Sequence, residues 1–181
     1  MQVFNARQVL LTLFMLLVSN SVAAADKHYN VTAPDGVRIA VQESGNPNGQ
    51  PIIFIHGLLG SHLNWEKQLQ DKQLQSYRLI TFDLRGHGIS DKPQLEATYL
   101  NGKFWADDLA AVIDGSKANK PLLVGWSLGG AIITNYLAAY TDARLSGVMY
   151  VGGVVELAEG QIPAHPDEYR DMISDNLKNA P

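Results

Sequence analysis

The pentapeptide at residues 125–129, Gly-Trp-Ser-Leu-Gly, constrains the fold of this chain more than any other stretch. An apolar run over residues 121–125 leads into it, and a helix-compatible run over residues 129–136 follows it. This order predicts a buried strand, a sharp turn and a helix. A serine held on such a turn has a strained backbone, which pushes the hydroxyl of Ser127 above the sheet.

The predicted turn would supply a nucleophile and half of the electrostatic stabilisation that acyl transfer needs. If Ser127 attacks a carbonyl carbon, the N–H of Leu128 at the start of the helix points toward the developing oxyanion. Gly125 and Gly129 leave room for the tight turn on either side of the serine. The pentapeptide alone also fits a glycine-rich turn without chemistry, so the rest of the sequence has to decide.

Composition narrows the class of protein. A chain of 181 residues with 46% hydrophobic residues and a formal charge of -4 is typical of one globular domain. Lysine and arginine are scattered among acidic residues without a basic stripe, so we expect no nucleic-acid partner. The sequence has no cysteine, which excludes disulfides, a thiol nucleophile and a cysteine-linked lipid anchor within it.

Residues 1–25 have the pattern of a secretory signal peptide. Arg7 precedes an apolar run over residues 9–18, and three alanines at 23–25 form a small-x-small cleavage site before Asp26. The run of ten residues is short of the roughly 20 that a spanning helix needs, so we expect no stable membrane anchor after cleavage. The sequence therefore predicts export, either to the periplasm or into the medium.

The pattern of apolar runs beyond the signal peptide predicts an α/β fold. Two short strands, 29–32 and 37–44, flank a turn sequence and indicate an antiparallel hairpin. Apolar runs typical of buried parallel strands alternate with helical stretches, which favours a doubly wound, mostly parallel sheet. The expected strands are 51–55, 77–83, 121–125 and 145–152, and the expected helices are 62–75 (with Leu63, Leu69 and Leu74 toward the core), 101–114, 129–136 and 167–178.

Three loops carry a resemblance to a known family. They are His56-Gly57 after the strand 51–55, the loop 83–90 after the strand 77–83, and the pentapeptide at 125–129. In this order and spacing the sequence resembles the α/β-hydrolase fold family over roughly residues 29–155. Within that family it is similar to the serine esterases, lactonases and cofactor-free haloperoxidases.

The resemblance implies a reaction and a set of residues. Ser127 would be the nucleophile that forms an acyl-enzyme with a small-molecule acyl substrate, a small carboxylic ester, without a cofactor or a metal. The backbone amides of Leu58 and Leu128 would form the oxyanion hole. The supporting turn residues would be His56, Gly57, Gly125 and Gly129.

The acid and the base of the implied catalytic triad are harder to place. The family order is serine, acid, histidine, and only one histidine, His165, follows Ser127 in this sequence. His165 lies where the family has a cap over the pocket, and not after a final strand. Glu156, just past the strand 145–152, is the better candidate for the acid. Asp83 is the other candidate, but it precedes the serine, against the family order.

Other polar and aromatic residues have structural interpretations. Asp83, Arg85 and Asp91 are expected to form one charge cluster that fixes their loop. A metal site built from His56, His62 and His87 would lack a helix-spaced ligand pair, so we expect none. The tryptophans are expected in the core and the pocket wall; they are Trp65, Trp105 and Trp126.

The domain boundaries that follow are a signal peptide at 1–25, the N-terminal part of the core at 26–155 and the start of a cap at 156–181. The family has two further strands and a terminal helix that carry the acid and the histidine, so we expect this sequence to be an N-terminal part of that fold. Three hypotheses stay open: an exported serine hydrolase, a catalytically silent chain, and a cofactor-free perhydrolase. The oligomeric state is also open.

Overall fold

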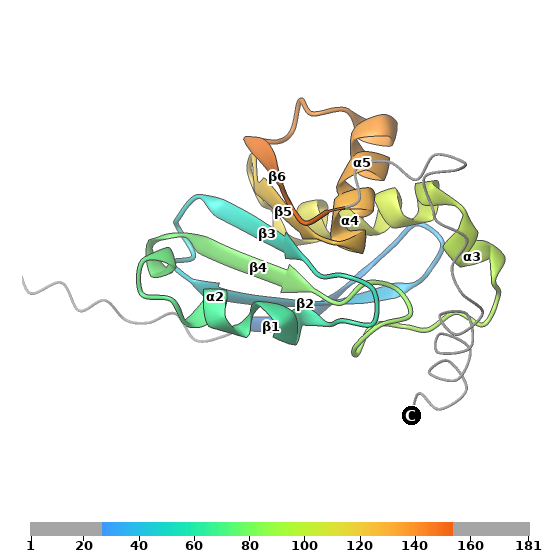
Figure 1. The fold of residues 1–181 in the computed structure, drawn as a ribbon, viewed down its shortest axis with the longest axis horizontal. Coiled ribbons are helices and arrows are strands. Elements are labelled where there is room, and N and C mark those ends of the chain that lie inside the picture. The colour runs from blue at the N-terminus through green and yellow to red at the C-terminus, as the bar shows by residue number, and fades with distance from the viewer. Residues whose placement is uncertain (1–26, 154–181) are drawn as a thin grey trace, which may run out of the picture.

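A six-stranded mixed sheet organises residues 27–153, the part of the chain that the computed structural model describes (Figure 1). The strands lie in the order β1-β2-β4-β3-β5-β6. β1 pairs with β2 and β2 with β4 in the antiparallel sense, and the remaining pairs are parallel, which confirms the predicted fold class. The strands are β1 Lys27–Thr32, β2 Arg38–Gly45, β3 Pro51–Ile55, β4 Arg78–Phe82, β5 Leu122–Trp126 and β6 Gly147–Val151.

Two helices cover one face of the sheet, α4 (Gly102–Ser116) and α5 (Leu128–Tyr140) (Figure 1). Asn101 caps α4 by accepting a hydrogen bond from the Lys103 N–H at 2.9 Å, and the helix ends at Lys117 in the left-handed conformation. Four apolar residues at helical spacing on this helix are buried; they are Trp105, Leu109, Val112 and Ile113. A short helix before it, α3 (Ala97–Leu100), was not predicted.

The opposite face carries three short pieces in place of the single helix that the sequence predicts over residues 62–75. They are η1 (His62–Trp65), α2 (Glu66–Gln70) and η2 (Leu74–Ser76). The helix stops because Asp71 is extended, with a ψ of 122°. Leu69 and Leu74 pack toward the sheet as predicted, whereas the prediction for Leu63 is wrong: its side chain is 64% exposed.

Trp65 occupies the buried position that was predicted for Leu63. Its ring packs on Phe54 of β3 with ring centroids 5.0 Å apart. Phe54 and Ile52 point to this face of the sheet, and Ile53 and Ile55 point to the face covered by α4 and α5. β3 is therefore buried on both sides, as its unbroken apolar run predicts.

β6 forms the edge of the sheet within residues 27–153. It pairs with β5 in parallel, as expected, with Val124 opposite Met149. Three apolar side chains on it are exposed: Val148, Met149 and Val151. Across the same residues, no helix combines the length and the hydropathy that crossing a membrane requires.

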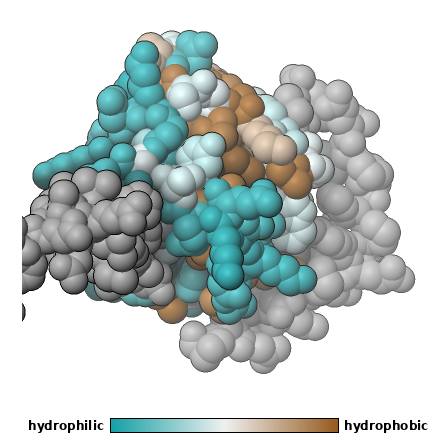
Figure 2. All heavy atoms as spheres, turned by 90° about the vertical axis from the view of Figure 1, so that its left-hand side faces the viewer, coloured by the Kyte–Doolittle hydropathy of each residue, from teal (hydrophilic) through white to brown (hydrophobic). Residues whose placement is uncertain are grey.

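The strands β3 and β4 run toward the loops that the sequence analysis singled out. In Figure 1 their arrows point to the right, so the loops at 56–61 and 83–91 leave the sheet on that side. Figure 2 shows the other end of the molecule, the left-hand side of Figure 1. Its surface is hydrophilic over much of its area, with hydrophobic residues gathered mainly in the upper half. The loops after β3 and β4 thus lie at the carboxyl ends of the parallel strands, where ligands of open α/β sheets bind.

The packing of α4 predicts different costs for two leucine truncations. Leu109 is fully buried between α4 and the sheet, whereas Leu63 is exposed. We expect Leu109→Ala to lower the free energy of unfolding by about 2–5 kcal/mol, because it leaves a cavity in the core. Leu63→Ala is the matched control and should cost less than about 0.5 kcal/mol. Urea unfolding followed by circular dichroism measures both, and equal costs would contradict the packing.

Candidate active site at the carboxyl ends of β3 and β5

Ser127 lies on a strained turn between β5 and α5, as the sequence predicts. Its φ of 52° and ψ of -117° lie outside the regions that non-glycine residues normally occupy. The Ser127 N–H donates to the Val151 carbonyl at 3.3 Å, and the Ser127 carbonyl accepts from the Gly130 N–H at 2.9 Å. These two bonds hold the strained residue between β6 and the first turn of α5.

The flanking glycines are required by close contacts between backbones. A Cβ on Gly125 would lie 2.6 Å from the carbonyl carbon of Gly129. A Cβ on Gly129 would lie 2.3 Å from the carbonyl oxygen of Ile55, at the end of β3. Any larger residue at either position would push α5 away from the sheet. These contacts agree with the prediction that the tight turn has no space for a side chain at Gly125 or Gly129.

The loop after β3 lies beside Ser127. Ile55 is paired with Gly125, so residues 56–58 leave the sheet next to the serine turn. A Cβ on Gly57 would lie 3.0 Å from the Cβ of Ser127. Within residues 27–153, neither the Leu58 N–H nor the Leu128 N–H donates a hydrogen bond to a protein acceptor. Leu128 is the first residue of α5, where helix N–H groups are left unpaired.

His56 is a structural residue of this loop. Its side chain is fully buried, its Nδ1–H donates to the Gly57 carbonyl at 2.7 Å, and its Nε2 accepts from the Leu84 N–H at 3.0 Å. Burial lowers the pKa of His56 to about 4. The ring is therefore neutral at physiological pH, and both of its nitrogens are engaged in positioning backbone.

The other two histidines near these loops have their own partners. His62 Nδ1 lies 2.9 Å from Asp83 Oδ1, and His87 Nδ1–H donates to the Arg85 carbonyl at 2.9 Å. Burial lowers the pKa of His87. Within residues 27–153, no group of three or more histidine, aspartate or glutamate side chains is arranged to hold a metal ion.

The predicted charge cluster of Asp83, Arg85 and Asp91 is wrong, because the three side chains have separate partners. Asp91 pairs with Arg38 at 2.9 Å, and the Asp83 carboxylate accepts from the His62 and Ile89 backbone amides. Each residue fixes a different part of the loop 83–91.

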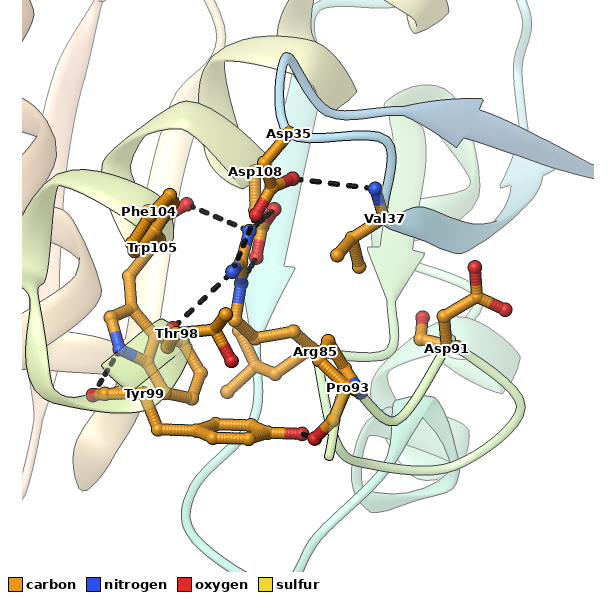
Figure 3. Close-up of polar contacts among 12 residues, drawn as sticks. Asp35, Val37, Arg85, Asp91, Pro93, Thr98, Tyr99, Phe104, Trp105 and Asp108 are labelled. Atoms are coloured by element: carbon orange, nitrogen blue, oxygen red, sulfur yellow. Dashed lines mark hydrogen bonds and ion pairs between the residues drawn. The ribbon is translucent and has the colours of Figure 1, made fainter. Parts of the chain in front are cut away.

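The Arg85 guanidinium is fully buried and binds two aspartates (Figure 3). Its Nε donates to Asp108 Oδ2 at 2.6 Å and its Nη2 to Asp108 Oδ1 at 2.7 Å, a bidentate pair, and Nη1 donates to Asp35 at 2.9 Å. Neither aspartate was predicted from the sequence as a partner of Arg85. Asp108 lies between Trp105 and Leu109 on the buried stripe of α4, and an acid on an apolar stripe is the signal that would have found it.

The remaining site candidates lie in different places. Trp65 and Trp105 are in the core, as predicted, whereas Trp126 is 40% exposed and packs its ring against the Gly57 backbone. Glu156 and His165, the candidate acid and base, lie outside the described residues.

Within residues 27–153, a strained serine lies on a strand-turn-helix unit beside close glycines and two amides without a protein acceptor. Sequence comparison places this arrangement in a known fold family. The family profile described as alpha/beta hydrolase fold matches residues 50–180, so the chain belongs to the α/β-hydrolase fold family.

Three relatives show the range within that family. The chain is 64% identical to a candidate aryl esterase from Burkholderia cenocepacia, over 84% of this chain and 56% of that one, with a TM-score of 0.79. It is 34% identical to the esterase RhEst1 from Rhodococcus sp. ECU1013, over 74% and 48% of the two chains, with a TM-score of 0.66. It is 32% identical over 124 residues to a non-heme chloroperoxidase of Streptomyces lividans, covering 68% and 44%. The chain thus spans about half the length of these relatives.

The buried His56 predicts a pH dependence of stability. Its pKa is about 4 in the folded protein against about 6.5 in the unfolded chain, so the unfolded chain binds the proton more tightly. The stabilisation is complete above about pH 6.5 and decreases toward pH 4, by about 3 kcal/mol in all. The physical cause is burial of the ring, which disfavours the charged form. In addition, a protonated Nε2 could no longer accept from the Leu84 N–H.

Urea unfolding at a series of pH values measures this loss. His56→Gln keeps an acceptor near the Nε2 position without titrating there, so its free energy of unfolding should depend less on pH between 4 and 6.5. His28→Gln, on the exposed face of β1, is the control and should keep the full slope. An unchanged slope in His56→Gln would show that His56 is not the titrating group.

Proposed function

We propose that the protein is a serine hydrolase that cleaves small carboxylic esters through an acyl-enzyme on Ser127. The observation that carries this proposal is the strained Ser127 beside the amides of Leu58 and Leu128, neither of which finds an acceptor among residues 27–153. A backbone conformation of this kind is costly and persists where the surrounding structure enforces it, typically at functional sites. The similarity to esterases supports the same reaction.

The proposed reaction has two steps. Ser127 Oγ attacks the ester carbonyl carbon, and the carbonyl oxygen becomes an oxyanion that accepts from the Leu58 and Leu128 N–H groups. The intermediate collapses, the alcohol leaves with a proton, and the acyl group stays on Ser127. Water then attacks the acyl-enzyme and releases the carboxylic acid. A base that takes the serine proton and an acid that orients this base complete the site, with His165 and Glu156 as the candidates from the sequence.

The substrate and the location of the protein are part of the proposal. Leu58 and Trp126 border the serine turn, and neither carries a charge, so we propose an uncharged, small acyl substrate. The similarity to a candidate aryl esterase favours aromatic esters among such substrates. The signal-like pattern of residues 1–25 supports export.

Replacing the proposed nucleophile tests the reaction directly. Ser127→Ala should abolish covalent labelling by a fluorophosphonate and nearly all hydrolysis of p-nitrophenyl esters, because no acyl-enzyme forms. Ser146→Ala is the control, since Ser146 is exposed just before β6. Intact-mass spectrometry detects the label. Labelling that survives in Ser127→Ala would place the nucleophile elsewhere, and an unmodified protein that takes no label would favour the catalytically silent chain.

A second activity is supported by the similarity to a non-heme chloroperoxidase. In perhydrolysis, hydrogen peroxide attacks the acyl-enzyme in place of water, and a peroxyacid leaves while the Ser127 hydroxyl is restored. We expect both activities to disappear in Ser127→Ala, because they share the acyl-enzyme. Assays of carboxylic acid and of peroxyacid formed from one ester in the presence of hydrogen peroxide measure their ratio. Perhydrolysis that persists in Ser127→Ala would contradict a shared intermediate.

A further inference from the structure

The loop over residues 57–61 is tied at both ends to the end of β4. At its start, His56 Nε2 accepts from the Leu84 N–H at 3.0 Å. At its end, the His62 backbone N–H donates to Asp83 Oδ1 at 2.6 Å, and the ring Nδ1–H donates to the same carboxylate at 2.9 and 3.1 Å. Two histidines therefore clamp the loop that carries the Leu58 amide.

Asp83 is built into the fold as an acceptor for this clamp. Its carboxylate is fully buried, and the Ile89 N–H donates to it at 2.9 Å in addition to the two His62 donors. A Cβ on Gly88 would lie 2.2 Å from the carboxylate, so the pocket around it is closed. Removing a donor from a buried carboxylate costs free energy, so the hydrogen bond from the His62 ring to Asp83 is strongly favoured.

Asp83 itself is fixed to the sheet. Its N–H donates to the Ala40 carbonyl of β2 at 3.0 Å, and its carbonyl accepts from the Ser90 hydroxyl at 2.6 Å. The Ser90 hydroxyl oxygen in turn accepts from the Ala40 N–H at 2.9 Å. The His62 ring thus connects the loop to a rigid part of the molecule.

The loop has little internal support between its two ends. Among the described residues, its only internal backbone bond runs from the Gly60 N–H to the Gly57 carbonyl, at 3.1 Å. Leu59 lies at a φ of 60°, a strained value for leucine, and is half exposed. The direction of the Leu58 N–H therefore depends on how the ends of the loop are held.

The His62 ring is not needed to start the 3₁₀ helix that follows. Ser61 and Asn64 already form a capping box, in which the Ser61 N–H donates to Asn64 Oδ1 at 2.8 Å and the Leu63 N–H donates to Ser61 Oγ at 3.3 Å. The ring of His62 is therefore free of a local helix role, and its bond to Asp83 acts between loops.

We propose that His62, through its ring Nδ1–H to Asp83, is a positioning residue that holds the Leu58 N–H toward the oxyanion formed at Ser127. This inference rests on the proposed function. An oxyanion donor acts more strongly in the transition state than on bound substrate, so a loosened loop lowers kcat and leaves KM nearly unchanged. Removing such a donor costs about 10²–10³ in kcat, and a displaced one costs part of that.

The test compares His62→Leu with His62→Asn. Leucine removes the ring donor, whereas the asparagine amide can donate from the position of Nδ1. We expect His62→Leu to lower kcat for p-nitrophenyl acetate roughly tenfold or more at similar KM, and His62→Asn to restore it to within about threefold. His28→Leu, on β1, is the control for loss of a histidine outside the site and should keep the activity of the unmodified protein.

Amide hydrogen exchange of residues 57–61 gives a readout that does not depend on turnover. Exchange should be faster in His62→Leu than in the unmodified protein and in His62→Asn. Faster exchange with unchanged kcat would overturn the positioning role, and unchanged exchange would overturn the clamp itself. Activity that survives in Ser127→Ala, or a protein without any turnover, would instead overturn the proposed function, and the exchange result would still decide the clamp.

Discussion

The contact between the start of α5 and the end of β3 is the constraint on which the site depends. The Gly129 backbone packs so closely on the Ile55 carbonyl that a single Cβ would overlap it. This approach forces the chain between β5 and α5 into one turn, and Ser127 takes the strained conformation that the turn requires. The same contact brings the loop after β3 beside the serine. Backbone packing therefore positions the proposed nucleophile, Ser127, and places the loop that carries the Leu58 amide next to it.

Buried charges hold the second layer of the site. Arg85 joins the loop after β4 to α4 through Asp108 and to the turn between β1 and β2 through Asp35 (Figure 3). Breaking a buried pair of this kind typically costs 3–5 kcal/mol, because one charge is left uncompensated. These ion pairs add to the His56 and His62 contacts in fixing the loop after β4. Fixing this loop matters for the proposed oxyanion hole, because such donors act only when they are positioned before the reaction.

Local patterns predicted the parts of the fold that depend on local physics. Strand β3 is an unbroken apolar run because it is buried on both faces, and the Ser127 turn is visible because only glycine tolerates its backbone contacts. The single helix over 62–75 was wrong because the periodicity of Leu63 and Leu69 says nothing about the extended Asp71 between the helical pieces. Trp65 is buried where Leu63 was expected, because it packs on Phe54, which lies on a strand that the local periodicity does not take into account.

Long-range pairing was the part of the site that the sequence did not predict. Arg85, Asp83 and Asp91 are neighbours in sequence, which suggested one cluster, yet each finds its partner on a different element, namely α4 for Arg85, η1 for Asp83 and β2 for Asp91. Charges in a loop can pair with any element that folds over them, so spacing along the chain carries little information about the pairs. Only the placement of Asp108 on an apolar helix stripe gave a local signal.

The histidines show which part of the proposed triad residues 27–153 can supply. His56 uses both ring nitrogens to hold backbone. His62, the first residue of η1, bonds to the Asp83 carboxylate, and His87, in the loop after β4, bonds to the Arg85 carbonyl. The loop with His87 follows β4, which is separated from β5 by β3, roughly 10 Å at the usual strand spacing, whereas a general base must lie within about 3 Å of the serine hydroxyl. His28 lies on β1, at the far edge of the sheet. The described histidines are thus committed to the scaffold, and the base of the proposed reaction is to be sought outside these residues.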